Sequence, residues 1–270
     1  MASDQTIKSI SDEHGIYRTP PGVKPSLAAR AAPFLYFYAQ AVSTVLRGGR
    51  MARLGGYDDA AWFGDSLRML RALESVGVRF EVSGVENVSR VDGPCIFIAN
   101  HMSTLETFVL PCIIRPHKEF TFVVKKSLVE YPVFGHIMRA RDPITVGREN
   151  PREDFVAVVE GCSERLRAGL SVVVFPQTTR SAVFDPKEFN SIGVKAARKA
   201  GVPVVPIALK TDAWGNGRLI KEMGRIDPSR PVHICFGGPI EVTGRGDEAH
   251  RSVVEFIRGK LDAWGAQADG

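Results

Sequence analysis

The stretch CIFIANHMSTLE, residues 95–106, decides how the rest of the chain is interpreted. Its first five residues are largely apolar and predict a short strand that is covered on both faces. The polar residues that follow predict a turn, and the pattern of residues 104–114 predicts a helix. A buried strand that leads through a turn into a helix is typical of α/β proteins, whose ligands bind beyond the carboxyl ends of the strands.

The same alternation of strand and helix continues along the chain. The predicted strands cover residues 79–82, 95–99, 120–124, 144–146, 172–175, 204–209 and 232–236. Further helices are predicted over residues 152–168, 191–200 and 248–264. We therefore expect an α/β fold with a central, mostly parallel sheet flanked by helices.

The N-terminal part of the chain predicts a helical pair. Residues 1–25 predict an extended arm, because prolines and polar side chains dominate them. The apolar run FLYFYAQAVSTVL, residues 34–46, is shorter than the roughly 20 residues that a bilayer-spanning helix needs. Residues 58–75 form an amphipathic pattern, and this pair of helices either packs on the core or lies in a lipid interface. We expect the arm and a membrane-proximal helical pair in residues 1–75 and the α/β domain in residues 76–270.

Composition limits the class of protein. With 270 residues, 44% hydrophobic and 24% charged, the chain is expected to form one globular core with an appended N-terminal segment. This excludes a disordered chain, a fibre and a polytopic membrane protein. The net charge of +5 suits anionic partners such as phosphorylated ligands or anionic lipid. No cluster of basic residues indicates nucleic acid.

The cysteines and the N-terminus indicate the compartment. The cysteines are far apart, without a C-x-x-C pair, and predict reduced, buried thiols rather than a zinc or redox site; they are Cys95, Cys112, Cys162 and Cys235. Acidic residues and prolines stand where a signal peptide would need a basic and then an apolar stretch. Export is therefore not indicated.

His101 and Glu106 form the first candidate site. Five residues apart on a regular helix, they would lie about 140° from each other, so the histidine is expected before the helix begins. With Ser103 or Thr104 as N-cap, Glu106 lies in the first turn and can reach the ring. A carboxylate on one ring nitrogen raises the basicity of the other, which suits a general base for a hydroxyl. A loop histidine that only caps a helix is the alternative for this pair alone.

Two arginines follow other predicted strands. In FPQTTRS, residues 175–181, Arg180 stands between the hydroxyls of Thr179 and Ser181, and its planar guanidinium can donate two bonds to a phosphate. A turn with a surface arginine is the alternative here. Arg148 ends the short segment ITVGR, residues 144–148, where a ligand site and an ordinary loop are equally compatible with the residues.

These motifs also occur together in one order. Asn-His-x4-acid at 100–106 is followed by Lys-Lys-Ser-Leu at 125–128, Pro-x-Phe-Gly at 132–135, a strand ending in Arg148, Phe-Pro-Gln-Thr-Thr-Arg-Ser at 175–181 and Val-Pro-Val-Val-Pro-Ile at 202–207. In this order the chain resembles the glycerolipid acyltransferase family, typified by 1-acyl-glycerol-3-phosphate acyltransferases, over residues 95 to about 210. Glu106 stands where the family usually has aspartate, and Gln177 and Thr178 stand where it has glutamate and glycine.

The resemblance implies direct acyl transfer from acyl-CoA or acyl carrier protein to the hydroxyl of a lysophospholipid such as 1-acyl-glycerol-3-phosphate. His101 would act as general base, oriented by Glu106, and amides near residues 202–206 would stabilise the oxyanion. The residues implied in substrate binding are Arg148, Arg180, Thr179, Ser181 and Gln177. No metal and no cofactor apart from the acyl donor is implied. The implied partners are the lipid acceptor and a membrane surface, with no nucleic acid, and the implied location is the cytoplasmic face of a membrane.

Other interpretations remain open from the sequence. The departures at Glu106, Gln177 and Thr178 are compatible with a lipid- or membrane-binding relative that has lost catalysis, or with an acyltransferase for a different lipid alcohol. A hydrolase-like enzyme that uses Ser103 as nucleophile is less favoured, because the Gly-x-Ser-x-Gly elbow is missing.

Overall fold

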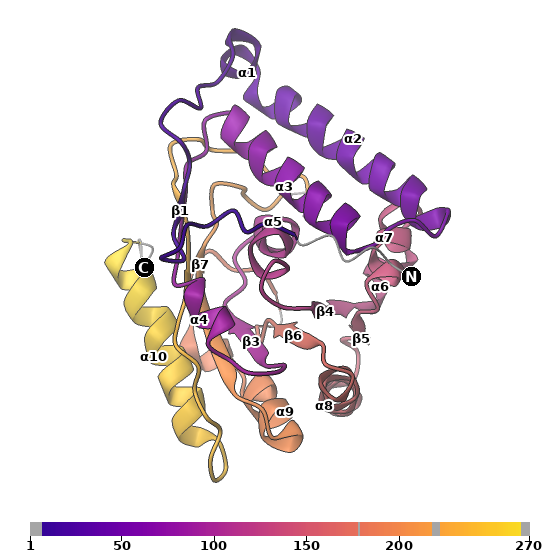
Figure 1. The fold of residues 1–270 in the computed structure, drawn as a ribbon, viewed down its shortest axis with the longest axis vertical. Helices are drawn as coiled ribbons and strands as arrows, with labels where there is room; N and C mark the ends of the chain where they lie inside the picture. The colour runs from indigo at the N-terminus through magenta and orange to yellow at the C-terminus, as the bar shows by residue number, and fades with distance from the viewer. Residues whose placement is uncertain (1–6, 178, 218–221, 266–270) are drawn as a thin grey trace.

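The computed structural model describes residues 7–177, 179–217 and 222–265. At its centre is an eight-stranded sheet in the order β1-β2-β8-β7-β3-β6-β4-β5 (Figure 1). The strands are β1 (Tyr17–Arg18), β2 (Phe80–Ser83), β3 (Ile96–Ala99), β4 (Phe120–Lys125), β5 (Ile144–Val146), β6 (Ser171–Val174), β7 (Val204–Lys210) and β8 (Val232–Phe236). Among these described strands, only the β1–β2 and β7–β8 pairs are antiparallel. The predicted α/β fold with a mostly parallel sheet is confirmed, and every predicted strand lies within one residue of its observed bounds.

Helices cover both faces of this sheet. They are α1 (Leu27–Ala31), α2 (Pro33–Arg53), α3 (Asp59–Ser75), α4 (Glu86–Ser89), α5 (Leu105–Ile114), α6 (Lys126–Glu130), α7 (Phe134–Ala140), α8 (Pro151–Arg167), α9 (Ile192–Ala200) and α10 (Asp247–Ala263), with a 3₁₀ turn η1 (Pro186–Glu188). In Figure 1, α2, α3 and α5 lie on one side of the sheet and α8, α9 and α10 on the other. The short helices α6 and α7 were not predicted, because five and seven residues are too few to show a helical period.

Burial on both faces explains the apolar strands. In β3, Ile96 and Ile98 belong to the hydrophobic cluster shared with α8, α9 and α10, whereas Phe97 and Ala99 belong to the cluster shared with α2, α3 and α5. Successive side chains of a strand point to opposite faces, so both sets must be apolar. All four residues of β3 are thereby buried.

The N-terminal helical pair packs on the same core. Helix α2 lies against α3 and α7, and its inner residues share the hydrophobic cluster of the sheet. The arm adds β1, where Tyr17 pairs with Val82 of β2. A strand of two residues carries no alternating pattern, which is why the sequence did not predict it. The domain boundary after residue 75 stays a prediction.

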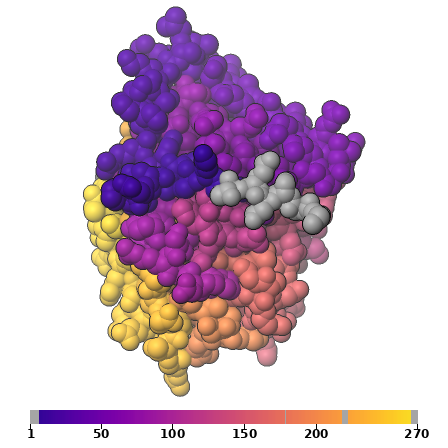
Figure 2. Space-filling model, in the orientation of Figure 1, coloured from indigo at the N-terminus to yellow at the C-terminus, as the bar shows by residue number. Residues whose placement is uncertain are grey.

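One face of the α1–α2 segment remains exposed. Its large apolar side chains at the surface include Leu27, Leu35, Val42 and Leu46. In Figure 2 this segment forms the indigo and violet upper part of the molecule. Among the described residues, none of the helices combines the length and the apolar character that crossing a bilayer requires.

Burial of the cysteines predicts their reactivity. All four are free and buried, as expected from the sequence. Burial raises the pKa of Cys95 to about 11 and that of Cys112 and Cys162 to about 12. Because the thiolate is the reactive form, we expect the native protein to resist iodoacetamide at about pH 8 and the denatured protein to react at four sites, as measured by intact mass. Rapid labelling of the folded protein would contradict this burial.

Candidate active site

The predicted site residues follow the carboxyl ends of strands in the parallel part of the sheet. His101 follows β3, Arg180 follows β6 and Arg148 follows β5. Strands β7, β3, β6, β4 and β5 are consecutive in the sheet and run in the same direction. The loops after these strands therefore open at one edge of the sheet. A backbone bond joins two of them, since the Ser181 N–H donates to the His101 carbonyl at 2.9 Å.

The histidine and the carboxylate are in contact, as predicted. His101 lies in the turn before α5, and its Nδ1 is 3.1 Å from Oε1 of Glu106. The histidine side chain is 10% exposed, whereas that of Glu106 is 0% exposed. The ring stacks on Phe175, with 4.3 Å between the ring centroids. An ionised carboxylate can only accept, so Nδ1 carries the proton in the neutral ring and Nε2 carries the lone pair.

The Glu106 carboxylate is held by several donors. Oε1 also accepts from the N–H groups of Met102 at 2.7 Å and Ser103 at 3.0 Å. Oε2 lies 3.0 Å from the Ser103 hydroxyl and accepts from the Thr211 hydroxyl at 2.7 Å. Burial by itself raises the pKa of Glu106, but the bonds from His101, Thr211 and the Ser103 amide outweigh it and hold the pKa below its ordinary value. The carboxylate is therefore ionised at neutral pH.

The predicted helix cap is only partly right. Ser103 Oγ accepts from the Leu105 N–H at 3.1 Å, whereas the Thr104 side chain makes no capping bond. The Met102 and Ser103 amides bond to Glu106 instead. One carboxylate thus orders both the turn and the ring.

Thr211 was not predicted from the sequence. It follows β7, the neighbour of β3, and is 0% exposed. A single threonine after a strand belongs to no motif, and only the pairing of β7 with β3 brings it to Glu106. The topology therefore completes a network that local sequence begins.

We expect the Thr211→Val variant to be less stable and less active. Valine keeps the shape but removes the donor to Oε2 of Glu106, a bond to a charged group that is worth about 1.5–3 kcal/mol. Urea denaturation and initial rates measure the two effects, and Thr211→Ser, which keeps the hydroxyl, should restore most of both. Equal losses in the serine and valine variants would show that shape matters here and the hydroxyl does not.

The backbone around His101 is fixed by side chains. Asn100 pairs with Leu209 through two bonds of 2.8 Å, one in each direction, and so ties the end of β3 to β7. Gln177 is 5% exposed, and its Oε1 accepts from the His101 N–H at 2.6 Å. Gln177 therefore positions the histidine in this structure, and its contact with substrate stays a prediction.

The hydroxyl residues around Arg180 differ in their surroundings. Ser181 Oγ donates to the Val183 carbonyl at 2.7 Å and accepts from the Val183 N–H at 3.2 Å, which closes a turn. Thr179 is exposed. Thr178 lies outside the described residues. Substrate contacts of Thr179 and Ser181 stay predictions.

The two arginines lie within electrostatic reach of each other. The Arg180 side chain is 15% exposed, and its Nη1 is 3.3 Å from Oε1 of Glu222. Partial burial, and then the positive charge of Arg180, lower the pKa of Arg148, while Asp154 opposes this effect. Two guanidinium groups at one sheet edge favour a ligand with two negative charges.

The prediction for residues 202–206 is wrong. The Val202 N–H donates to the Ala197 carbonyl, and the Val204 N–H to the Ile240 carbonyl. Val204 begins β7 and pairs with Ile96, the first residue of β3. The segment therefore lies at the amino ends of these strands, whereas His101 follows the carboxyl end. The order of the motifs along the chain does not tell at which end of a strand each motif lies.

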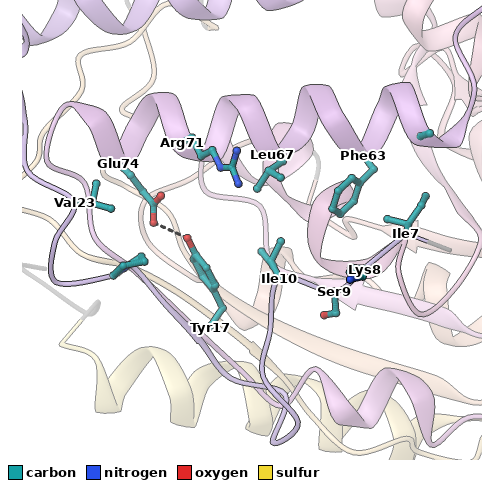
Figure 3. A pocket seen from close by; sticks show the side chains of 12 residues that line it. Ile7, Lys8, Ser9, Ile10, Tyr17, Val23, Phe63, Leu67, Arg71 and Glu74 are labelled. Atoms are coloured by element: carbon teal, nitrogen blue, oxygen red, sulfur yellow. Dashed lines mark hydrogen bonds between the residues drawn. The ribbon is translucent and has the colours of Figure 1, made fainter. Parts of the chain in front are cut away.

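A cavity of about 700 Å³ lies elsewhere, between the N-terminal arm and α3. Figure 3 shows Ile10 and Tyr17 of the arm facing Phe63, Leu67 and Glu74 of α3, with the Tyr17 hydroxyl donating to Glu74 at 2.8 Å. None of the residues predicted for the site lines this cavity. No group of three or more His, Cys, Asp or Glu side chains is placed to hold a metal ion in the part of the chain that the structure describes.

The chain resembles known acyltransferases. The model of the Acyltransferase family matches residues 79–210. The 1-acyl-sn-glycerol-3-phosphate acyltransferase of Pseudomonas aeruginosa is 30% identical over 189 residues, which cover 70% of this chain and 68% of that protein. The chloroplastic 1-acyl-sn-glycerol-3-phosphate acyltransferase BAT2 of Brassica napus is 32% identical over 140 residues, 52% of this chain and 38% of that protein.

A solved structure shares the fold. The crystal structure of the 1-acyl-sn-glycerophosphate (LPA) acyltransferase PlsC from Thermotoga maritima superposes with a TM-score of 0.64 at 22% identity. The superposition covers 90% of this chain and 99% of that chain. The resemblance inferred from the motif order is confirmed: the chain belongs to the glycerolipid acyltransferase family and is an O-acyltransferase.

Proposed function

We propose that this acyltransferase esterifies the free hydroxyl of a lysophospholipid such as 1-acyl-sn-glycerol-3-phosphate, with acyl-CoA or acyl carrier protein as the donor. The observation that carries the proposal is the His101–Glu106 contact at the sheet edge that also carries Arg148 and Arg180. A hydroxyl nucleophile needs a base, and a phosphorylated acceptor needs cations. The names of the relatives from Pseudomonas and Brassica support this acceptor.

In the proposed reaction His101 acts as base and then as acid. Nε2 takes the proton of the acceptor hydroxyl while that oxygen attacks the thioester carbonyl of the donor. Glu106 holds Nδ1–H and stabilises the positive charge that forms on the ring. The tetrahedral intermediate then expels the thiolate, which takes the proton from Nε2 and leaves as the thiol. The ester forms without a covalent acyl-enzyme.

Two residues that differ from the family pattern still make contacts that order the site. Glu106 reaches His101 although it is one methylene longer than the usual aspartate. Gln177 bonds the His101 amide through a neutral side chain. Both observations support an active enzyme over a relative that only binds lipid.

The exposed face of α1 and α2 is proposed to rest on the cytoplasmic surface of a membrane, where the acceptor resides. Leu35, Val42 and Leu46 form its apolar part, and Arg50 and Arg53 are exposed at the end of α2. Apolar side chains beside cations are typical of helices that lie in an anionic lipid interface.

The proposal is tested by incubating the detergent-purified chain with a panel of lysophospholipids and either acyl-CoA or acyl carrier protein, with products followed by mass spectrometry. We expect a diacylated phosphate product from 1-acylglycerol 3-phosphate. Transfer only to an alcohol without phosphate would favour a different lipid alcohol as acceptor. Binding to lipid vesicles without transfer to any acceptor would favour the non-catalytic alternative.

A further inference from the structure

Arg148 has an unusual backbone conformation. It lies two residues beyond β5 with a φ of 64°, in the left-handed region. Among the described non-glycine residues, only Asp142 shares a positive φ. A side chain at such a position crowds the backbone, so surrounding contacts must hold the conformation. The direction in which the guanidinium leaves the chain depends on these contacts.

Asp154 supplies two of these contacts. This half-buried residue lies in the first turn of α8, and its Oδ1 and Oδ2 accept from the N–H groups of Gly147 and Arg148, each at 2.9 Å. A charged acceptor makes each of these bonds stronger than a neutral one would. Both bonds go to backbone amides, so they fix the turn itself.

The helix that carries Asp154 is itself well anchored. Asn150 caps α8 by accepting from the Arg152 N–H at 3.0 Å, and Pro151 occupies its first position. A capped helix of 17 residues is a rigid support for a carboxylate. Asp154 also lies close enough to the Arg148 guanidinium to oppose the effect of Arg180 on its pKa.

We propose that Asp154 is a positioning residue for recognition of the acceptor's phosphate: by clamping the amides of Gly147 and Arg148, it sets where the Arg148 guanidinium lies relative to Arg180. The inference rests on the proposed function, in which these two arginines bind that phosphate. The sequence did not single out Asp154, because an acid in the first turn of a helix is common for reasons of helix stability alone.

The test compares Asp154→Asn and Asp154→Ala with a matched control, Glu153→Gln. Glu153 is the neighbouring acid in the same turn, and its carboxylate bonds the Asn150 side chain at 2.7 Å. Three quantities are measured for each variant: the KM and the kcat for 1-acylglycerol 3-phosphate, and the Kd of this acceptor by calorimetry without an acyl donor. The same measurements on a 1-monoacylglycerol of equal chain length report acceptor binding without the phosphate.

We expect Asp154→Asn to raise the KM and Kd for the phosphorylated acceptor about tenfold, with kcat nearly unchanged. The reason is that a displaced Arg148 guanidinium no longer aligns its hydrogen bonds with the phosphate. Asp154→Ala should have a larger effect, and Glu153→Gln should stay within about twofold. Binding of the 1-monoacylglycerol should not change. Equal losses for both acceptors would overturn the proposal, since they would indicate a general loss of structure.

Asp154→Asn is also measured in a protein that already carries Arg148→Ala. This double variant tests the role of Asp154 separately from the proposed phosphate site. If Asp154 acts through Arg148, Asp154→Asn has no further effect on the Kd in this background. If Arg148→Ala weakens binding and Asp154→Asn does not, the inference alone fails. If Arg148→Ala leaves the Kd for the phosphorylated acceptor unchanged, the proposed phosphate site fails, and the role of Asp154 fails with it. Melting temperatures of all variants establish that each is folded under the assay conditions.

Discussion

The His101→Ala variant should lose acyl transfer by about 10²–10⁴-fold, the range that general acid–base catalysis contributes. Alanine removes the Nε2 lone pair that would take the proton of the acceptor hydroxyl. The fold should survive, because the bonds to Gln177 and Ser181 involve the backbone of residue 101 and do not depend on its side chain. Initial rates at saturating donor and acceptor, together with a melting curve, measure the two effects.

His117→Asn is the matched control for this loss. The His117 ring bonds the hydroxyls of Ser9 and Ser89 at 3.1 and 3.0 Å. His117 follows the C-terminus of α5, whereas His101 precedes its N-terminus. Removing this ring should leave the rate of transfer nearly unchanged. A folded His101→Ala variant that keeps its rate within a few-fold of the wild type would contradict the role of His101 as base.

The local part of the site could be predicted from the sequence. The turn before α5 is short, so the spacing of His101 and Glu106 was enough to predict that the ring lies outside the helix and reaches the carboxylate. The shared edge of Arg148 and Arg180 was also predictable, since the carboxyl ends of parallel strands meet at one edge. The strands could be predicted from apolar runs, because a strand that is covered on both faces has few positions for polar side chains.

The residues that hold the site in place could not be predicted from local sequence patterns. Thr211 reaches Glu106 only because β7 lies next to β3. Asp154 lies only six residues after Arg148, but the sequence did not single it out, because an acid in the first turn of a helix is common. For residues 202–206 the order of the motifs led to a wrong prediction of amides near His101. That order does not tell at which end of a strand a segment lies. The contact of Thr211 and the place of residues 202–206 depend on strand order and direction, which no local pattern encodes.

Replacing Glu106 with glutamine should reduce transfer nearly as much as loss of the histidine, again by about 10²–10⁴-fold. The carboxylate accepts from His101, from the Met102 and Ser103 amides and from Thr211. An amide offers one oxygen and one NH₂ group, so some of these donors would face another donor. Where the NH₂ faces Nδ1, the ring carries its proton on Nε2 and cannot act as base.

The Glu106→Asp variant is the conservative counterpart. Aspartate is the residue that the family usually has here, and it keeps the negative charge on a shorter side chain. We expect its rate to lie between those of the wild type and Glu106→Gln. If the aspartate and glutamine variants lost activity equally, the length of the side chain would matter more than its charge.

The same carboxylate predicts how stability depends on pH. Because the pKa of Glu106 in the folded protein is below its ordinary value of 4.5, ionised Glu106 stabilises the fold above that value, and this contribution is lost as the pH falls through the lowered pKa. Glutamine cannot ionise, and it leaves buried donors unsatisfied at a cost of about 1–3 kcal/mol. The difference in free energy of unfolding between the wild type and Glu106→Gln should therefore be largest near neutral pH and shrink on acidification below about pH 4. Urea denaturation across this range measures it, and a difference that does not change with pH would mean that the charge of Glu106 does not stabilise the fold.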